Sequence, residues 1–417
     1  MIETTTHIKT DKKLLPQLRF KEFDGEWKVL KLKDVAKIAR GKFTPRPRNN
    51  PIYYNGDIPF VQTSDVVNAN GKIEVYTQTL NEKGLAVSKL FPAGTILITI
   101  AANIGHVGVL QIDMACPDSL IGITPNNETH NYFLNYYLAT HQEKMDYLAP
   151  EGAQKNINID FLNPYKVPST SLPEQQKIAS FLSAVDEKIQ QLTKKKALLE
   201  QYKKGGLQQL FSGQLRFKDE NGNPYPDWEE KRLKDVLHEH KTKNKDGSVT
   251  EVFSVAKQKG VVNQIEHLGR SFAAATTLHY KVAFPGDLIY TKSPTKDFPF
   301  GIIKQNLTGR KGLVSPLYVV TTPQTNSLGF MFHCYFLSWV NVYNYLVPLI
   351  QKGAKNTMNI NNDEYLNGAK FMLPVSKKEQ KKIARYLSSI DTKIEAINNQ
   401  ITQTQTFKKG LLQQMFV

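Results

Sequence analysis

The chain contains little cysteine and no long apolar run. Its 417 residues include two cysteines, Cys116 and Cys334, which excludes a disulfide framework and a cysteine-ligated metal site. Residues 1–10 lack the apolar core of a secretion signal, so we expect a cytoplasmic protein. The most apolar stretch, residues 328–340, includes His333 and is too short to cross a bilayer. We therefore expect no membrane partner.

Motifs for common catalytic chemistry are also missing. No Gly-x-x-x-x-Gly-Lys-Ser/Thr sequence is present to bind a nucleoside triphosphate. Asn50-Pro51-Ile52-Tyr53 is similar to the motif with which adenine methyltransferases hold a flipped base, but no glycine-rich cofactor loop precedes it. Asp227 lies too close to Glu229-Glu230-Lys231 for a restriction-nuclease core, and His238 and His240 share no helical face. We assign this chain no catalytic residue, no metal ligand and no cofactor of its own.

Acidic residues are outnumbered by basic ones. The chain has 54 lysines and arginines against 38 aspartates and glutamates, a formal net charge of +16. Clustered cations gain free energy by releasing the counterions condensed on a polyanion, so this excess favours a nucleic-acid partner. The alternative is a protein that is basic without binding any polyanion.

The most informative feature that is present is an internal duplication. Residues 174–183 recur at 379–388, and residues 207–211 recur at 412–416, in both cases 205 positions later. Shorter matches extend the repeat through the rest of the chain: they pair Leu18-Arg19-Phe20 with Leu215-Arg216-Phe217, Trp27 with Trp228, Leu32–Val35 with Leu233–Val236, Thr99 with Thr291, and Asn158-Ile159 with Asn359-Ile360. A period of about 200 residues far exceeds that of solenoids and propellers. It predicts two whole domains in tandem.

Each copy ends in a long helix with an apolar residue every three or four positions. These residues are Ile178, Leu182, Val185, Ile189, Leu192 and Leu199 in the first copy, and Ile383, Leu387, Ile390, Ile394, Ile397 and Ile401 in the second. Their 3.5-residue period predicts a coiled-coil seam rather than a helix lying on a globular core. Lys196 interrupts the first seam.

The two helices could pair with each other or with another molecule. We favour an antiparallel pair within one chain, because the two seams are nearly equivalent; an intermolecular zipper is the alternative. A helix of about 38 residues spans on the order of 57 Å, more than the roughly 34 Å of one turn of B-DNA. The apolar residues at the helix ends either close the coiled coil or form a partner surface; they are Leu207, Leu210, Phe211, Leu412, Met415 and Phe416.

The segments that carry the duplication resemble a known family. Glu174-Gln175-Gln176-Lys177-Ile178-Ala179 and Glu379-Gln380-Lys381-Lys382-Ile383-Ala384, each preceding a heptad helix, are similar to the conserved region of type I restriction-modification specificity subunits. Gly56–Val61, Leu313–Tyr318 and residues 152–156 resemble signatures of their target recognition domains. The likeness covers nearly the whole chain, although Val375–Lys378 departs from the usual proline-containing approach to the second helix.

The resemblance implies an α+β fold with two tandem mixed α/β target recognition domains. Each is followed by a long helix, and the two helices pair as an antiparallel coiled coil with pseudo-two-fold symmetry. We expect an N-terminal extension at 1–17, recognition domain 1 at 18–165, a central helical region at 166–212, recognition domain 2 at 213–370 and a C-terminal helical region at 371–417.

The resemblance also implies a function without catalysis. Each recognition domain would read one half of a bipartite site in double-stranded DNA, while the helices set the spacing and hold the partners. The partners implied are two modification (methyltransferase) subunits and two restriction (translocase-nuclease) subunits, which would carry S-adenosylmethionine, ATP and magnesium. The alternatives are a self-contained DNA methyltransferase or nuclease with a duplicated reader, and a coiled-coil scaffold that binds only proteins.

Candidate DNA contacts lie in polar loops at equivalent positions of the two copies. Basic residues follow the Leu32–Val35 anchor and its counterpart, where they could hold phosphates: they are Arg40, Lys42, Arg46 and Arg48, and Lys241, Lys243 and Lys245. Polar residues follow the two threonine anchors, where they could reach base edges: they are Asn103 and His106, and Lys292, Ser293 and Lys296. Solvated loops and ordinary turn chemistry are the alternatives at these positions.

Further candidates lie elsewhere in each copy. Gln62, Thr63, Ser64 and Asp65 form another polar group that could reach base edges in the first domain. Lys155 and Lys355 lie just before the helical regions and could contact the DNA backbone.

Overall fold

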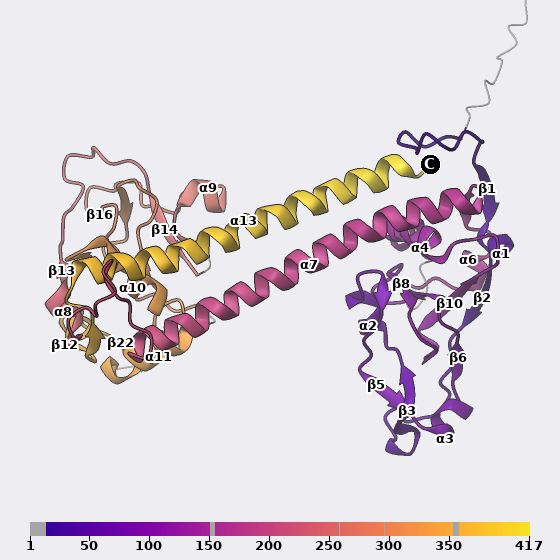
Figure 1. Ribbon diagram of the computed structural model, residues 1–417, viewed down its shortest axis with the longest axis horizontal. Helices are drawn as coiled ribbons and strands as arrows, with labels where there is room; N and C mark the ends of the chain where they lie inside the picture. Colours follow the sequence, from indigo (N-terminus) through magenta and orange to yellow (C-terminus); the bar gives the residue numbers. More distant parts are fainter. Residues whose placement is uncertain (1–13, 151–154, 258, 296, 353–357) are drawn as a thin grey trace, which may run out of the picture. The chain divides into compact units, whose positions relative to one another are not determined.

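The computed structural model describes residues 14–150, 155–257, 259–295, 297–352 and 358–417. The chain forms two compact units: Met1–Thr193 with Asn399–Val417, and Lys194–Asn398. Two long helices, α7 (Leu172–Phe211) and α13 (Lys377–Met415), each contribute one half to either unit (Figure 1).

A five-stranded sheet forms the centre of the first unit. Its strand order is β2-β10-β7-β8-β4, with β2 (Ala36–Arg40), β10 (Leu120–Pro125), β7 (Ile96–Thr99), β8 (Val107–Leu110) and β4 (Lys72–Ile73). In β7, Ile96 and Ile98 pack into one apolar cluster while Leu97 packs into another. This two-residue period places apolar side chains on both faces of the sheet, which explains why the strand is apolar throughout.

A second sheet and short helices complete the first unit. The sheet has the order β5-β3-β9-β6, with β5 (Gln78–Leu80), β3 (Tyr54–Phe60), β9 (Met114–Cys116) and β6 (Lys89–Phe91). β1 (Lys28–Lys31) pairs with β11 (Lys166–Ser169), the strand that leads into α7. The short helices are α1 (Leu32–Val35), η1 (Pro51–Tyr53), α2 (Thr63–Asn68), α3 (Glu82–Ala86), α4 (Asn131–Thr140), α5 (Gln142–Leu148) and α6 (Ile159–Leu162).

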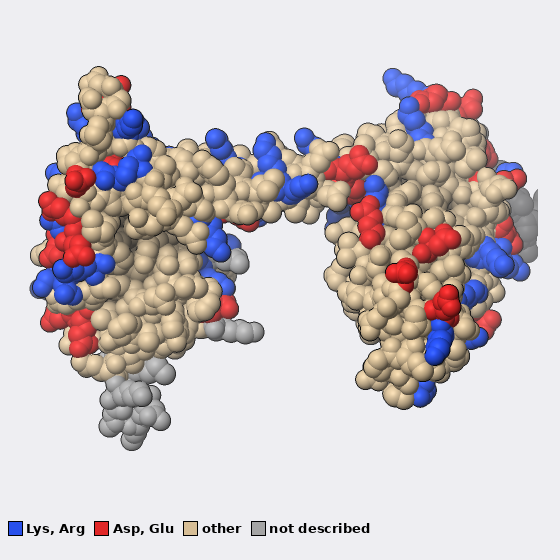
Figure 2. Space-filling view, turned by 60° about the horizontal axis from the view of Figure 1, so that its bottom comes forward, with Lys and Arg blue, Asp and Glu red and all other residues tan. Residues whose placement is uncertain are grey.

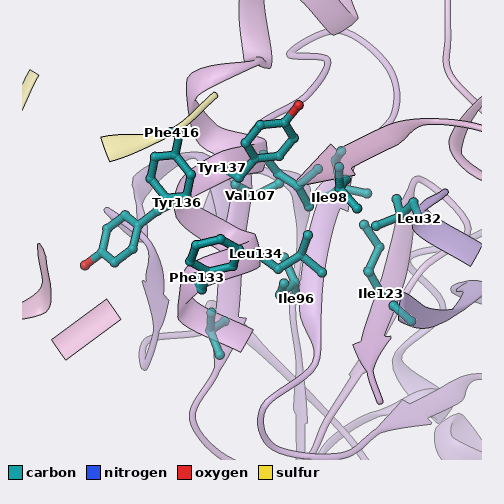
Figure 3. Close-up of a cluster of buried hydrophobic side chains, with 14 of the residues drawn as sticks. Leu32, Ile96, Ile98, Val107, Ile123, Phe133, Leu134, Tyr136, Tyr137 and Phe416 are labelled. Carbon is teal, nitrogen blue, oxygen red and sulfur yellow. The ribbon is translucent and has the colours of Figure 1, made fainter. Parts of the chain in front are cut away.

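The core of the first unit lies between the five-stranded sheet, α4 and the ends of the long helices. Figure 3 shows Phe133 and Tyr137 of α4 beside Phe416, which follows the last residue of α13. The ring centres of Phe133 and Phe416 lie 5.2 Å apart, and those of Trp27 and Phe416 lie 6.4 Å apart. The end of α13 is therefore part of this core, as are Ile178 and other residues from the start of α7.

The second unit repeats this arrangement. Its four-stranded sheet has the order β13-β20-β17-β18, with β13 (Leu237–Glu239), β20 (Val319–Pro323), β17 (Leu288–Tyr290) and β18 (Ile303–Gln305). These strands correspond in order to β2-β10-β7-β8. The structure thus confirms the predicted α+β fold of two similar units.

Smaller elements surround the second sheet. The paired strands are β12 (Glu229–Lys231) with β23 (Phe371–Leu373), β14 (Phe253–Ala256) with β15 (Gly260–Asn263), β16 (Lys281–Ala283) with β19 (Gly312–Val314), and β21 (Gln351–Lys352) with β22 (Met358–Asn359). The helices are α8 (Leu233–Val236), α9 (Gln264–Leu268), α10 (Asn326–Tyr335), α11 (Trp339–Leu346), η2 (Val347–Leu349) and α12 (Asn362–Asn367).

The long helices pair antiparallel within the chain, as predicted. In the first unit, Asp186 of α7 lies 2.6 Å from the Lys408 ammonium of α13. In the second unit, Lys203 of α7 lies 2.6 Å from Asp391 of α13. Asp186 and Asp391 are equivalent in the repeat, as are Lys203 and Lys408, so the pairing is reciprocal. Lys196, the break in the first seam, donates to the Asn398 side chain at 2.8 Å.

The predicted pairing of the long helices is confirmed. The prediction that these helices form a seam rather than lie on a globular core was wrong, because they do both. Ile178 and Leu182 are buried in the same apolar cluster as Trp27, and Ile383 and Leu387 share one with Trp228. The first half of each helix therefore lies on the core of its own domain as well as beside the other helix. Leu210, Met415 and Phe416 are buried in these clusters too, which removes these three from any exposed partner surface.

The repeated Glu-Gln pair explains why the domains are attached firmly to the helices. Glu174 is buried and accepts two hydrogen bonds from Arg19, at 2.7 and 2.8 Å. Glu379 accepts from Arg216 in the same way, the shorter bond being 3.0 Å. Burial raises the pKa of the Glu174 carboxyl, but the hydrogen bonds from Arg19, Thr170 and Trp27 lower it overall. Both glutamates tie the irregular segment that precedes the first strand of a unit to the first turn of a long helix.

The neighbouring glutamines tie the same helices to α4 and α10. The Gln175 side-chain oxygen accepts from the His130 amide at 2.8 Å, and the Gln380 oxygen accepts from the Thr325 hydroxyl at 2.6 Å. His130 and Thr325 are the residues that precede α4 and α10. The shared motif therefore encodes a structural joint, made once in each unit.

A main-chain hydrogen bond also recurs at each helix end. The Leu215 amide donates to the Gln209 carbonyl at 2.9 Å, and the Leu18 amide donates to the Gln414 carbonyl at 2.9 Å. Leu18 and Leu215 are equivalent in the repeat, as are Gln414 and Gln209. The end of α13 thus meets the first domain as the end of α7 meets the second.

Candidate nucleic-acid interface

The strand order brings the predicted loops of each copy to one edge of its sheet. In the first unit, Ile121 of β10 pairs with Arg40 on one side and with Ile98 on the other. In the second unit, Thr321 of β20 pairs with Glu239 and with Leu288. Because β2 and β7 are both antiparallel to β10, their carboxyl ends share one edge, and the same holds for β13 and β17. The basic loops, which contain residues 40–48 and 241–245, and the polar loops, which follow Thr99 and Thr291, begin at that edge.

Two buried threonines anchor the polar loops through hydrogen bonds. The Thr99 hydroxyl accepts from the His106 amide at 3.0 Å and donates to the Asn103 carbonyl. The Thr291 hydroxyl accepts from the Ile302 amide at 3.0 Å. The same anchor therefore closes two loops of different length and sequence.

A turn at Pro117-Asp118-Ser119, which was not predicted, gathers three of the predicted residues in the first unit. Arg40 Nε donates to the Asp118 carbonyl at 2.7 Å, and Arg48 Nη2 donates to the two carboxylate oxygens of Asp118 at 2.7 and 3.0 Å. The Thr63 hydroxyl donates to Ser119 at 3.3 Å. The turn precedes β10, at the edge where the loops begin. The Pro-Asp-Ser composition between two apolar strands was a turn signal that could have identified it.

Lys42 and Arg46, the other predicted residues of the basic loop, are exposed. Lys42 extends into solvent, whereas Arg46 donates to the carbonyl groups of Pro45 at 2.8 Å and Phe43 at 3.3 Å. Arg48 and Asp118 are both partly exposed, so their ion pair is worth only about 0.2–1 kcal/mol. A phosphate could replace Asp118 as the partner of Arg48 at little cost.

Residues 62–65 form the start of α2. The buried Asp65 carboxylate accepts from the Gln62 amide at 2.8 Å and from the Thr77 hydroxyl at 3.3 Å, which closes the first turn of the helix. The Gln62 side chain donates to Gln78 at 3.0 Å. Ser64 is exposed. Of these four predicted side chains, Asp65 is thus turned toward the protein's own amides.

Lys155 lies beside the polar loop of the first unit. Its neighbour Asn156 forms a bridge with Ala101, at the start of that loop. The Lys155 ammonium is 3.5 Å from Asp146, and both side chains are partly exposed. Asn103 is exposed and His106 is half-buried. The structure therefore places Lys155 next to the start of the loop that contains Asn103 and His106.

A cluster of lysines marks the same edge in the second unit. The main chain of Lys243 forms an isolated antiparallel β-bridge with that of Lys281 in β16. Burial lowers the pKa of Lys281, Glu239 raises it, and the charges of Lys241, Lys292 and Lys243 lower it further. The two predicted loops therefore converge here, and their ammonium groups repel one another. An anion at this place would relieve that repulsion.

One carboxylate and one amide hold the polar loop of this cluster. Lys292 Nζ donates to the Asn362 side chain at 2.6 Å, and Asn362 Nδ2 donates to the Glu239 carboxylate at 2.7 Å. Burial lowers the pKa of Lys292, while Glu239 raises it. Lys292 also has a positive φ of 55°, so this loop is held in a less common backbone conformation.

Other predicted residues lie around the cluster or outside the described residues. Ser293 is exposed and its hydroxyl donates to the Thr291 carbonyl at 3.3 Å. Lys245 is exposed at the far end of the basic loop. Lys296 and Lys355 fall outside the described residues. Lys281, Glu239 and Asn362 were missed, because only the strand order brings them beside residues that are distant in sequence.

The net positive charge does not form a uniform coat. Figure 2 shows basic and acidic side chains interspersed over the visible face of each unit. The edges that carry the loops are thus distinguished by local arrangement rather than by charge excess alone.

Within the described ranges, no cluster of three or more His, Cys, Asp or Glu side chains is placed to hold a metal ion. None of the helices in that part of the chain is long and apolar enough to cross a membrane.

Comparisons with known proteins point in one direction. Residues 24–201 match the family model described as the type I restriction modification DNA specificity domain. The chain is 28% identical over 243 residues to the type I restriction enzyme MjaIX specificity subunit of Methanocaldococcus jannaschii, an alignment that covers 53% of this chain and 55% of that protein. The match thus spans about half the length of this curated relative.

Solved structures share the fold over a larger part of the chain. The S subunit of a type I restriction-modification system from M. genitalium has a TM-score of 0.60 at 14% identity, covering 97% of this chain and 99% of that one. A chain from a study of complex assembly and conformational transition of the type I R-M system has a TM-score of 0.50 at 16% identity, covering 94% and 96%. At these identities the likeness concerns the fold.

Proposed function

Because the chain belongs to the family of type I restriction-modification specificity subunits, we propose that it selects the DNA target of a modification and restriction complex. Each unit reads one half of a bipartite site in double-stranded DNA. The paired helices set the spacing between the halves and dock two modification subunits, and two restriction subunits join for cleavage. S-adenosylmethionine, ATP and magnesium are bound by these partners, and this chain is not catalytic.

The observation that carries the proposal is the sheet edge from which a basic loop and a polar loop start, and which recurs in both units. The same strand order and the same threonine anchor present loops whose residues differ between the copies. Arg40 and Arg48 gather on the Asp118 turn in the first unit, whereas Lys243 and Lys292 gather around Lys281 in the second. Two unlike readers on a common scaffold fit a site with two unlike halves.

Co-expression with a type I modification subunit in a methylation-free host tests the proposal. We expect N6-methyladenine, mapped by single-molecule sequencing, in a split motif whose halves differ and which is absent without this chain. If a confirmed complex methylates nothing, the proposal fails in favour of a protein-only scaffold. If this chain methylates or cuts DNA without any partner, it is itself an enzyme.

A further inference from the structure

A polar pocket lies on the first unit beside the candidate interface. It has a volume of about 400 Å³ and is lined on one side by Asn49, Tyr54 and Asn55, around the start of β3, and on the other by residues 76–79, around the start of β5. This volume is within the usual range for small-molecule sites, roughly 300–1,000 Å³. The proposed contacts with phosphates and groove edges do not use it.

The pocket is formed by an irregularity in the sheet. Both Tyr54 and Ile58 of β3 pair with Leu80 of β5, so the residues between them have no partner on β5. Asn55 has a positive φ of 62°, a conformation that asparagine tolerates better than most residues. A Cβ on Gly56 would lie 2.5 Å from Asn81 Cα, so glycine is needed for this close approach. Bulges of this kind often redirect side chains beside functional sites.

One wall of the pocket is held rigidly. Asn81 Nδ2 donates to the carbonyl groups of Ile52 at 3.0 Å and Tyr54 at 3.1 Å. The Tyr54 hydroxyl donates to the Arg48 carbonyl, and its ring packs on Phe43 with ring centres 5.8 Å apart. Because the Arg48 guanidinium bonds to the Asp118 turn, the pocket is joined directly to the edge that we assign to DNA.

The other groups in the pocket have unused bonding capacity. The side-chain amides of Asn49 and Asn55 have no hydrogen-bond partner among the residues that the structure describes. Tyr76 is 36% exposed, and within the same residues its ring packs on no other aromatic ring. An asparagine amide offers a donor and an acceptor side by side, as the edge of a nucleobase does. An exposed ring offers a face on which a base can stack.

We propose that this pocket takes a single nucleobase displaced from the target duplex, with Tyr76 stacking on it and the Asn49 and Asn55 amides bonding its edge. The inference rests on the proposed function, because it places the base in the half-site read by the first unit. Arg48, next to Asn49, would hold a phosphate beside the displaced base. Unstacking a base costs a few kcal/mol, which the stacking and the amide bonds offset.

The test uses the full chain assembled with its modification subunit and a duplex that carries the mapped motif. 2-Aminopurine replaces one base at a time in both half-sites, and its fluorescence rises when it leaves the stack. We expect a rise at one position of one half-site that Tyr76→Ala and Asn55→Gly abolish. Asn55→Gly keeps the left-handed backbone while removing the amide. A rise at the methylated adenine would persist in both variants.

Affinity and folding controls separate the outcomes. Tyr147→Ala removes an 83% exposed ring on α5 and should leave every fluorescence signal unchanged. Tyr76→Ala should weaken binding to the motif about tenfold and leave binding to unrelated DNA unchanged, with an unaltered melting temperature. If the motif is bound specifically but no fluorescence rise depends on Tyr76 or Asn55, the pocket inference is wrong. If no motif is bound at all, the proposed function fails instead.

Discussion

Asp186 on α7 forms a 2.6 Å ion pair with Lys408 on α13, and the equivalent residues Asp391 and Lys203 form the same pair with the helices exchanged. Tyr136 also donates to Asp186 at 2.7 Å. We expect Asp186→Ala or Lys408→Ala to lower the free energy of unfolding by about 1 kcal/mol. In a double-mutant cycle followed by urea unfolding, the two effects should not add.

An exposed pair provides the control for this cycle. Glu22 and Lys177 lie 3.4 Å apart with both side chains largely exposed. Their cycle should give a coupling near zero. A similar coupling for both pairs would show that the interaction between the helices is no more than surface electrostatics.

Asp118→Asn should tighten DNA binding. The change frees Arg48 from its carboxylate partner, so the guanidinium can bind a phosphate. Each additional phosphate that the protein neutralises steepens the dependence of log K on log salt by about 0.9. Fluorescence anisotropy over a salt series measures this slope. Glu187→Gln, which removes an acid paired with Lys72 elsewhere in the unit, should leave the slope unchanged, and weaker binding by Asp118→Asn would contradict the assignment.

Lys241→Gln together with Lys243→Gln should weaken DNA binding through the second unit. Both lysines belong to the basic loop that converges on Lys281. The salt slope should become shallower by about 0.9 for each phosphate that the variant no longer neutralises. Lys234→Gln is a matched control, because α8 precedes β13 and so lies at the opposite end of that strand. Equally weakened binding in both variants would point to general charge rather than to this edge.

Lys304→Met should stabilise the protein at neutral pH. Lys304 is only 1% exposed on β18, and burial lowers its pKa to about 8, with a smaller lowering effect from Lys203 and an opposing effect from Cys334. Between about pH 8 and the ordinary lysine value near 10.5, the unfolded chain binds more protons than the folded one. Stability of the unaltered protein therefore rises with pH across this window.

The variant lacks this titration, so its advantage should be greatest at pH 7 and shrink above pH 8. The pKa shift corresponds to a gain of up to about 3 kcal/mol at pH 7. Urea unfolding at pH 7 and pH 10 measures it, with the exposed Lys311→Met as the control. An advantage that is equal at both pH values would assign the gain to packing and not to the buried charge.

The duplication and the long helices could be predicted because both depend on local sequence. Heptad spacing and the repeated Glu-Gln pair identify α7 and α13 directly. Their double use, on a domain core and beside the other helix, could not be predicted, because Ile178 and Ile383 satisfy both patterns equally. Periodicity reports that a face is apolar and does not report what covers it.

The candidate interface was predictable only in part for a related reason. Arg40, Lys243 and Lys292 follow recognisable anchors, so their loops could be proposed from the sequence. Asp118 and Lys281 join them through the order of strands in the sheet, which no local pattern encodes. Asp65 shows the converse: a polar residue in a promising segment serves as a helix cap.

The bond from Leu215 to Gln209 joins one module to the next along the chain, and the bond from Leu18 to Gln414 makes the same joint without a peptide link. Each domain is thus held at the end of the helix that follows the other domain, once through the chain and once through this hydrogen bond. A chain with its modules in the reverse order would contain the same two joints. Under the proposed function, recombination could trade one module for another while leaving both joints intact. New DNA targets could then arise by exchange of whole halves instead of by gradual change within a loop.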